Sequence, residues 1–202
     1  MNRLDITGLI LAGGRGTRMG SVDKGLQLFN GQPMVQQVLQ RLQPQVHGVL
    51  INANQNQDTY AAFGVPVHGD AIPDFTGPLA GLQTGLMHCP SPYLVTVPCD
   101  SPFVPTDLVG RLAQGLQAHN ADLAVAVTGE GAGQQRQSVF CLAKRALLPH
   151  LTHYLEGGGR KVETWLASQR VANVHFSDEA AFRNINTLDQ LRQWDSSAAP
   201  RA

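Results

Sequence analysis

Near its N-terminus the chain reads Ile6-Thr7-Gly8-Leu9-Ile10-Leu11-Ala12-Gly13-Gly14-Arg15-Gly16-Thr17-Arg18-Met19-Gly20, an aliphatic run that passes directly into glycines. The run over residues 6–12 is short, aliphatic and partly β-branched, which predicts a strand buried on both faces. In α/β proteins, ligands bind where such strands end, at the carboxyl edge of a parallel sheet. We therefore expect an α/β fold that presents a ligand site at this glycine loop.

Strand-like and helix-like patterns alternate along the rest of the chain. We expect strands at residues 48–52, 65–68, 93–97, 123–127, 138–142 and 171–176. Helices are expected to begin near residues 33, 58, 78, 105, 147, 161 and 188. This alternation predicts a mostly parallel central sheet with helices on both faces. We expect a single domain over residues 1–195 and a flexible tail over 196–202, where small and polar residues gather.

The composition excludes several classes of protein. The chain has 202 residues, of which 43% are hydrophobic and 15% charged, and its formal net charge is +0. A chain of this length can bury a sizeable core, and its balanced charges create no field that attracts nucleic acid. No stretch approaches the roughly 18 apolar residues of a membrane span, and no signal-peptide pattern opens the chain. We expect a cytoplasmic protein that contacts neither nucleic acid nor membrane.

The cysteines and histidines show no metal-binding or catalytic spacing. Cys89, Cys99 and Cys141 form no C-x-x-C pair, so we expect small, buried, reduced side chains. His150 and His153 share a helix face, but they have no acidic partner nearby in sequence, which disfavours a metal site. No G-x-S-x-G motif occurs, so the sequence contains no signal for acyl hydrolysis.

The glycine loop carries three cations, Arg15, Arg18 and Lys24, with Asp23 beside the last of them. Its glycine spacing matches neither the Rossmann fingerprint nor a Walker A loop. Glycines let backbone N–H groups approach a phosphate or a base that a Cβ atom would block, and clustered cations attract an anion. The loop therefore predicts an anion site, although a solvated strand-to-helix connection would use the same residues.

Two carboxylates follow strand-like segments. Asp70 comes after residues 65–68, and Asp100 comes after residues 93–97. Because parallel strands end at one edge of a sheet, we expect both carboxylates and the glycine loop to meet in one crevice. Carboxylate oxygens there can hold Mg²⁺ against the phosphates of a nucleotide. Asp100 before Ser101-Pro102 also suits an Asx turn, and this alternative stays open.

Two pairs of asparagines are weaker candidates. Asn52 and Asn54 follow the second strand and could bond a base or a sugar, or could favour a turn. Asn184 and Asn186 alternate in an extended segment, so we expect their side chains on one face. Thr187 is a candidate N-cap for the last helix.

In combination, these motifs resemble the molybdenum cofactor guanylyltransferase family. The resemblance is carried by Leu11-Ala12-Gly13-Gly14-Arg15-Gly16-Thr17-Arg18-Met19-Gly20-Ser21-Val22-Asp23-Lys24-Gly25-Leu26, Asn52-Ala53-Asn54, Gly69-Asp70, Gly77-Pro78-Leu79-Ala80-Gly81, Pro98-Cys99-Asp100-Ser101-Pro102-Phe103 and Asn184-Ile185-Asn186-Thr187. The stretch Asp23-Lys24-Gly25-Leu26 distinguishes this family from the related cytidylyltransferases and sugar-phosphate nucleotidyltransferases, whose sequences differ there. The resemblance covers nearly the whole chain and implies a Rossmann-like nucleotidyltransferase fold.

The resemblance also implies an activity: transfer of GMP from GTP to molybdenum-bound molybdopterin, which yields the guanine dinucleotide cofactor and pyrophosphate. The N-terminal half would bind the nucleotide, and the C-terminal half would mainly contact the acceptor. The implied nucleotide contacts are Leu11, Ala12, Gly13, Gly14, Lys24, Asn52, Asp70 and Asp100, and the implied acceptor contacts are Arg18, Ser21, Asn184 and Asn186. Asp100 would hold Mg²⁺, with Mn²⁺ as the alternative, and Lys24, Asp100 and Arg18 would be the catalytic residues.

Such a reaction needs no nucleophile from the protein. A phosphate oxygen of the pterin attacks the α-phosphorus in line, while positioning and charge neutralisation supply the rate. Two departures from the family pattern fall on the acceptor side: Ser21 replaces a glycine, and Gln137-Ser138 replaces a His-Pro or Glu-Pro pair.

Three alternatives stay open: cytidylyl transfer to molybdopterin, nucleotidyl transfer to a sugar phosphate, and a non-catalytic cofactor carrier. We expect a monomer whose further partners are other cofactor-biosynthesis proteins and molybdoenzyme chaperones.

Overall fold

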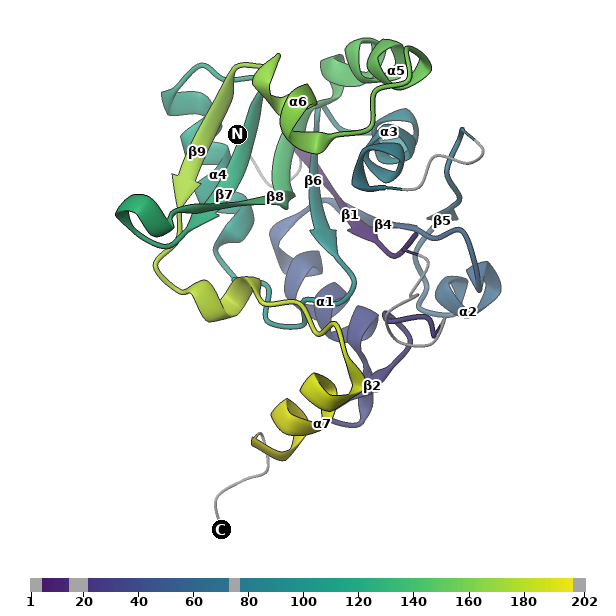
Figure 1. The fold of residues 1–202 in the computed structure, drawn as a ribbon. Helices are drawn as coiled ribbons and strands as arrows, with labels where there is room; N and C mark the ends of the chain where they lie inside the picture. The colour runs from purple at the N-terminus through teal and green to yellow at the C-terminus, as the bar shows by residue number, and fades with distance from the viewer. Residues whose placement is uncertain (1–4, 15–21, 73–76, 198–202) are drawn as a thin grey trace.

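The computed structural model describes residues 5–14, 22–72 and 77–197 of the chain (Figure 1). The strands are β1 (Ile6–Leu11), β2 (Leu28–Phe29), β3 (Gln32–Pro33), β4 (Gly48–Asn52), β5 (Val67–His68), β6 (Tyr93–Pro98), β7 (Leu123–Thr128), β8 (Gln135–Lys144) and β9 (Val171–His175). The α-helices are α1 (Met34–Leu42), α2 (Gln57–Ala61), α3 (Pro78–His88), α4 (Leu108–Ala118), α5 (Leu148–Glu156), α6 (Val162–Ala167) and α7 (Leu188–Ser197). Short 3-10 helices are η3 (Gln43–Gln45), η4 (Gly131–Gly133), η5 (Arg145–Leu147) and η6 (Glu179–Phe182).

A seven-stranded sheet forms the centre of the molecule, in the order β5-β4-β1-β6-β8-β7-β9. β1 pairs in parallel with β4 and with β6, and the pairs β4–β5 and β7–β9 are also parallel. The α/β fold and the mostly parallel sheet predicted from the sequence are therefore confirmed. β8 is the exception, because it runs antiparallel between β6 and β7.

β8 is longer than its sequence pattern predicted, and its direction follows from the connection before it. We expected a strand over residues 138–142, whereas the structure extends it to Gln135–Lys144. Only residues 129–134 separate β7 from β8. Parallel neighbours need a crossover of about a dozen residues or more. The two strands therefore form a hairpin, which reverses β8 relative to the rest of the sheet.

Helices cover both faces of the sheet, as predicted (Figure 1). Side chains alternate along β1: Ile6 and Ile10 pack in the cluster that includes α1 and α4, whereas Leu9 packs in the cluster that includes α3, α5 and α6. Trp165 of α6 is fully buried in the second cluster. β1 is thus buried on both faces, which explains why four of its six residues are Ile or Leu.

A small hairpin lies between the glycine loop and α1, where we expected the loop to lead directly into the helix. β2 and β3 pair antiparallel. Between them, Asn30 and Gly31 have φ angles of 51° and 75°. Positive φ at both central residues defines the two-residue turn for which Asn-Gly is the preferred sequence. The signal for this hairpin is therefore present in the sequence.

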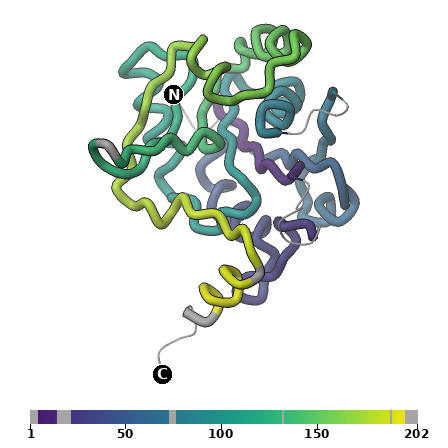
Figure 2. The backbone as a smooth tube through the Cα atoms, viewed as in Figure 1, coloured from purple at the N-terminus to yellow at the C-terminus, as the bar shows by residue number. Residues whose placement is uncertain are grey.

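The C-terminal helix α7 packs beside this hairpin (Figure 2). Phe29 and Ile185 belong to a small buried cluster, against which Leu191 and Trp194 of α7 pack. The helix continues to Ser197, two residues into the flexible tail that we expected from residue 196. The rest of that tail lies outside the described residues.

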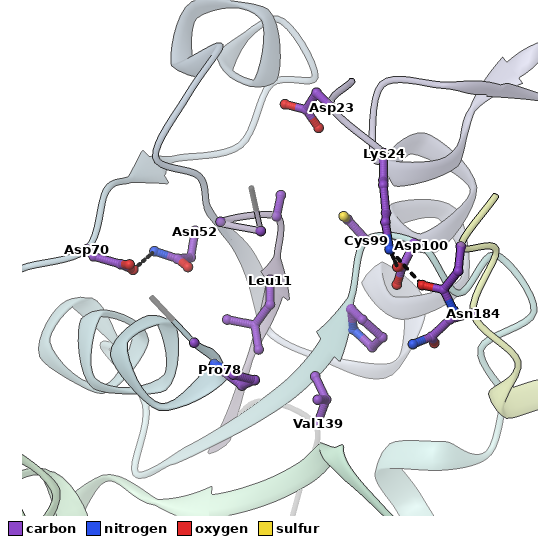
Figure 3. A pocket seen from close by; sticks show the side chains of 16 residues that line it. Leu11, Asp23, Lys24, Asn52, Asp70, Pro78, Cys99, Asp100, Val139 and Asn184 are labelled. Carbon is purple, nitrogen blue, oxygen red and sulfur yellow. Dashed lines mark hydrogen bonds and ion pairs between the residues drawn. The ribbon is translucent and has the colours of Figure 1, made fainter. Parts of the chain in front are cut away.

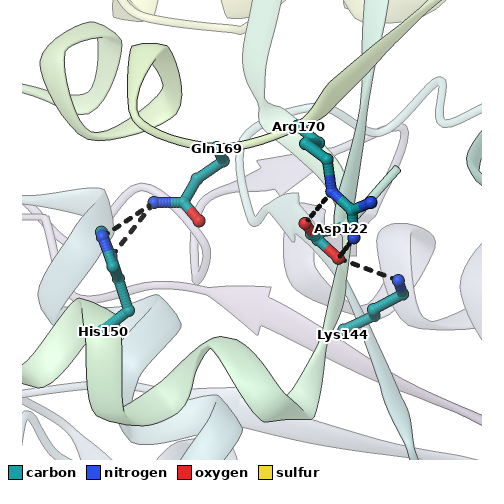
Figure 4. A network of polar contacts seen from close by, with 5 residues as sticks. All are labelled: Asp122, Lys144, His150, Gln169 and Arg170. Carbon is teal, nitrogen blue, oxygen red and sulfur yellow. Dashed lines mark hydrogen bonds and ion pairs between the residues drawn. The ribbon is translucent and has the colours of Figure 1, made fainter. Parts of the chain in front are cut away.

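A carboxylate joins the ends of three strands (Figure 4). Asp122 precedes β7 and accepts hydrogen bonds from Arg170 Nε at 2.7 Å, Arg170 Nη2 at 2.8 Å and Lys144 Nζ at 2.9 Å. Arg170 precedes β9, and Lys144 ends β8. The hydrogen bonds from Arg170 and Lys144 hold the pKa of Asp122 well below its usual value. The network lies at the ends of these strands and stabilises their pairing.

The three cysteines and His150 contribute to packing and hydrogen bonding inside the fold. All three cysteines are free and buried, as expected. His150 Nδ1 accepts a hydrogen bond from Trp165 Nε1 at 3.1 Å. The side-chain amide of Gln169 also lies 3.1 Å from this ring nitrogen (Figure 4). Among the described residues, no three His, Cys, Asp or Glu side chains are grouped to hold a metal ion.

None of the described helices combines the length and the apolar character needed to cross a membrane.

Gly85 provides a test of the packing of α3 on the sheet. A Cβ atom at this position would lie 2.8 Å from Leu94 Cδ2 and would also press on Leu9, and both leucines are buried. We expect Gly85→Ala to lower the free energy of unfolding by about 1–3 kcal/mol, because it overpacks the core. At Gly110 of α4 nothing lies within 4 Å, so Gly110→Ala should raise stability by up to about 1 kcal/mol. Urea denaturation measures the free energy of unfolding of both variants. Changes of the same sign in the two variants would contradict the close packing of α3 at Gly85.

The Asp122 network predicts a stability difference that depends on pH. A carboxyl whose pKa is lower in the folded state stabilises the fold above its unfolded pKa of about 3.9. This contribution is lost as the pH falls toward the folded pKa, because the carboxylate becomes protonated. We therefore expect Asp122→Asn to lower the urea midpoint at pH 7 and to approach the wild type progressively below about pH 4. A difference that remains constant with pH would show that the charge contributes nothing.

Candidate active site

A cleft of about 430 Å³ opens at the carboxyl edge of β1, β4 and β6 (Figure 3). It is lined by the predicted residues Leu11, Ala12, Gly13, Gly14, Lys24, Asn52, Asp70, Asp100, Asn184 and Asn186, and also by Asp23, Gly77, Pro78, Pro98, Cys99 and Val139. Asp70, Asp100 and the first glycines of the loop thus lie in one crevice, as a parallel sheet requires. Three other predicted site residues, Arg15, Arg18 and Ser21, lie outside the described residues.

Close backbone packing forms one wall of the cleft. A Cβ atom on Gly81 of α3 would lie 2.5 Å from Asn52 Oδ1 and would press on Leu11. A Cβ atom on Gly13 would lie 3.2 Å from the same oxygen. Glycine at both positions lets α3 approach the ends of β1 and β4. The side chains of Leu11 and Pro78 line this part of the cleft and give it an apolar surface (Figure 3).

The Asp70 carboxylate is held by two asparagines. Asn52 Nδ2 donates to Asp70 Oδ1 at 3.0 Å, and Asn54 Nδ2 donates to Asp70 Oδ2 at 2.8 Å. Asn54 Oδ1 in turn accepts from the backbone N–H of Asp70 at 2.8 Å. Asn52 is only 2% exposed. The amides that the sequence suggested as contacts to a base or a sugar therefore orient a carboxylate that faces the cleft.

Lys24 connects two distant parts of the chain inside the cleft. Its Nζ lies 3.2 Å from Asp100 Oδ2 and donates to Asn186 Oδ1 at 2.6 Å (Figure 3). The side chains of Lys24 and Asp100 are 20% and 11% exposed. Burial raises the pKa of Asp100, although the Lys24 ammonium acts in the opposite direction. The pair is thus largely shielded from water but still faces the cleft, where an anion or a metal ion can reach it.

The segment before α7 is attached to the loop that follows β6. Ile185 donates its backbone N–H to the carbonyl oxygen of Asp100 at 2.8 Å, and Ser101 Oγ donates to Asn184 Oδ1 at 2.5 Å. Both Asn184 and Asn186 line the cleft, although they bond different partners. Thr187 caps α7, since its Oγ1 accepts from the backbone N–H of Gln190 at 3.1 Å. These contacts bring the C-terminal part of the chain to the loop after β6, beside Lys24 and Asp100.

Val139 is a cleft residue that the sequence did not indicate. The register between β7 and β8 shifts between Val125 and Ala126, so β8 bulges at this point. The Thr96 hydroxyl donates to the carbonyl oxygen of Val139 at 2.5 Å. Gln137 instead bonds Thr128, at 2.9 Å. A bulge redirects side chains beside functional sites, and here it places Val139 in the cleft.

Cys99 is a second residue that the sequence did not assign to the site. Its thiol lines the cleft but is buried, and burial raises the pKa of Cys99 well above its usual value. The sulfur is therefore a neutral thiol at physiological pH. It has the character of a small packing group and not that of a nucleophile.

Comparisons with known proteins agree with this geometry. Residues 8–173 match the family model described as the MobA-like NTP transferase domain. A protein named molybdenum cofactor guanylyltransferase from Cupriavidus necator is 60% identical over 94% of this chain and 96% of that protein. One of the same name from Bordetella pertussis is 52% identical over 97% of this chain and its full length.

Solved structures support the fold. A crystal structure of molybdopterin-guanine dinucleotide biosynthesis protein A from Archaeoglobus fulgidus superposes with a TM-score of 0.77 at 20% identity, covering 95% of this chain and 97% of that one. At this identity the likeness establishes the nucleotidyltransferase fold. The family model and the full-length identities establish more: the chain is a nucleotidyltransferase that belongs to the molybdenum cofactor guanylyltransferase family.

Proposed function

We propose that this enzyme transfers GMP from GTP to molybdenum-bound molybdopterin, forming the guanine dinucleotide cofactor and pyrophosphate. Full-length relatives carry the name of this activity. The observation that carries the proposal is the pair of Lys24 and Asp100, 3.2 Å apart inside the cleft. A cation and a carboxylate that meet where parallel strands end are suited to a triphosphate and its metal ion.

GTP is proposed to lie along the wall formed by Leu11, Ala12, Gly13 and Gly14, with its sugar toward Asn52 and Asp70. Glycines allow the backbone of this wall to approach a ring closely. Each Asp70 oxygen accepts one hydrogen bond from an asparagine and retains capacity for another. Asp70 can therefore accept hydrogen bonds from the sugar hydroxyls.

Asp100 is proposed to hold Mg²⁺, with Mn²⁺ as the alternative. Mg²⁺ is usually bound by one or two carboxylates together with substrate phosphates. A single carboxylate that is 11% exposed and faces the cleft fits this mode of binding. When bound, the metal neutralises charge on the phosphates. Lys24 keeps Asn186 as a partner when Asp100 engages the metal.

The remaining chemistry depends on positioning. An oxygen of the acceptor phosphate forms a bond to the α-phosphorus while the bond from that phosphorus to pyrophosphate breaks. Lys24 lies in the cleft to neutralise charge on the phosphates, and Arg18 is proposed as a second cation. The protonated Cys99 thiol takes no covalent part. Orientation and electrostatic stabilisation then supply the rate.

The acceptor is proposed to contact Arg18, Ser21, Asn184 and Asn186. In support, both asparagines come from the C-terminal half of the chain and line the same cleft as the nucleotide residues. We further propose that residues 1–195 act as one domain in a cytoplasmic monomer. Other cofactor-biosynthesis proteins and molybdoenzyme chaperones are proposed as partners, because the product must reach the enzymes that use it.

Asp100→Asn provides a test of the catalytic assignment. It preserves the size of the side chain but removes the charge, so we expect turnover to fall at least about a hundredfold while the fold is retained. Pyrophosphate release from GTP, with molybdenum-loaded molybdopterin and Mg²⁺, is the measurement, and CTP is run in parallel. Asp107→Asn removes a carboxylate that is 61% exposed and should behave like wild type. If Asp100→Asn turned over GTP like wild type, the assignment of Asp100 to the catalytic site would be wrong. If pyrophosphate were released with CTP but not with GTP, only the proposed guanine specificity would be wrong.

Lys24→Met provides a test of the phosphate contact. Loss of a charge-assisted hydrogen bond is expected to weaken binding of Mg²⁺–GTP about tenfold or more. Isothermal titration calorimetry measures the affinity without requiring the acceptor. Lys161→Met is the matched control, because Lys161 is an exposed lysine outside the cleft. An unchanged affinity of Lys24→Met for Mg²⁺–GTP would show that Lys24 contributes to stability and not to nucleotide binding.

A further inference from the structure

Asp23 precedes Lys24 in the chain and lines the same cleft (Figure 3). Both of its carboxylate oxygens accept hydrogen bonds. Tyr60 Oη donates to Asp23 Oδ1 at 2.6 Å, and Asn56 Nδ2 donates to Asp23 Oδ2 at 3.0 Å. Both donors belong to the segment that follows β4. Asp23 is therefore attached to a part of the chain more than thirty residues away.

The two donors are themselves fixed in place. Tyr60 is fully buried in α2, and burial, together with the nearby Cys99 and Asp23, raises the pKa of its hydroxyl, which therefore remains a donor. Asn56 has a φ angle of 52°, a left-handed conformation that asparagine tolerates better than most residues. This conformation turns the chain into α2, and from there the Asn56 amide bonds Asp23.

Backbone hydrogen bonds hold the turn that carries Lys24, and Tyr60 packs against this turn. Gln27 donates its backbone N–H to the carbonyl oxygen of Lys24 at 3.0 Å, and Val35 donates to that of Gly25 at 2.9 Å. A Cβ atom on Gly25 would lie only 2.5 Å from Tyr60 Oη. The Tyr60 hydroxyl therefore contacts residues on both sides of Lys24.

A carboxylate is the group that fits between these two donors. It offers acceptors on both oxygens, whereas an amide at residue 23 would offer one oxygen and would oppose the second donor with an N–H₂ group. A negative charge near a bound triphosphate is unfavourable in itself. Its presence on the cleft wall therefore requires a role that an uncharged side chain cannot supply.

We propose that Asp23 is a positioning residue that acts through Lys24: anchored by Tyr60 and Asn56, it fixes the turn from which the Lys24 ammonium reaches the phosphates of the nucleotide. This inference rests on the proposed function only in taking a nucleoside triphosphate as the ligand. It requires neither a particular base nor a particular acceptor.

The test is a set of double-mutant cycles read by nucleotide binding. The affinity for Mg²⁺–GTP is measured by calorimetry for Asp23→Asn and Asn56→Ala, each in the wild-type and the Lys24→Met backgrounds. We expect each substitution to weaken binding by about five- to tenfold when Lys24 is present and by less than about twofold when it is absent. Loss of a support that acts on Lys24 has no further effect once the ammonium is gone.

Asn54→Ala is the matched control. Asn54 lies two residues before Asn56 and also holds a carboxylate, but that carboxylate is Asp70. Its effect should therefore be the same in both Lys24 backgrounds. Tyr60→Phe removes one hydrogen bond to Asp23, and it replaces Asp23→Asn in the cycle if the latter does not fold.

Equal losses of affinity in both backgrounds, or no loss when Lys24 is present, would overturn the inference and leave Asp23 as an anchor of the fold. If wild type binds CTP in place of GTP, the proposed base is wrong, and the same cycles with CTP still decide the role of Asp23. A wild-type protein that bound no nucleoside triphosphate would overturn both proposals.

Discussion

The parallel register of β1 between β4 and β6 is the constraint on which the site depends. Leu11 is paired with Asn52 on one side and with Pro98 on the other, so the three strands end side by side. The polar residues that follow them leave the sheet at one edge. Because side chains alternate along a strand, a slip of one residue would turn Asn52 to the opposite face and away from Asp70.

Charged groups are few in this chain, and those that the structure describes in the cleft have polar partners. Lys24 pairs with Asp100, while amide groups hold the carboxylates of Asp23 and Asp70. Partly buried charges without partners would be costly, and these contacts satisfy the charged groups and hold them in fixed positions. The asparagines at 52, 54 and 56 form a spaced series in which two hold one carboxylate and the third holds the other.

Local patterns were sufficient for most of the strands and helices, because each buried element carries its own periodicity or aliphatic run. Two missed features also had local signals: the Asn30-Gly31 turn predicts the β2–β3 hairpin, and the short connection after Thr128 requires an antiparallel β8. The bulge that places Val139 in the cleft had no such signal, because a register shift depends on the partner strand.

The linear chain was enough to locate the glycine loop, the carboxylates at the strand ends and the family, since these follow from residue types at fixed spacings. It could not show which donor each carboxylate meets. The contact from Lys24 to Asn186 spans 162 residues, and that from Tyr60 to Asp23 spans 37. Such pairings exist only once the sheet has assembled, because hydrogen bonds require donors and acceptors about 3 Å apart and no local pattern encodes that approach. The residues of the site were therefore visible in the sequence, whereas their roles in holding one another came from the tertiary structure.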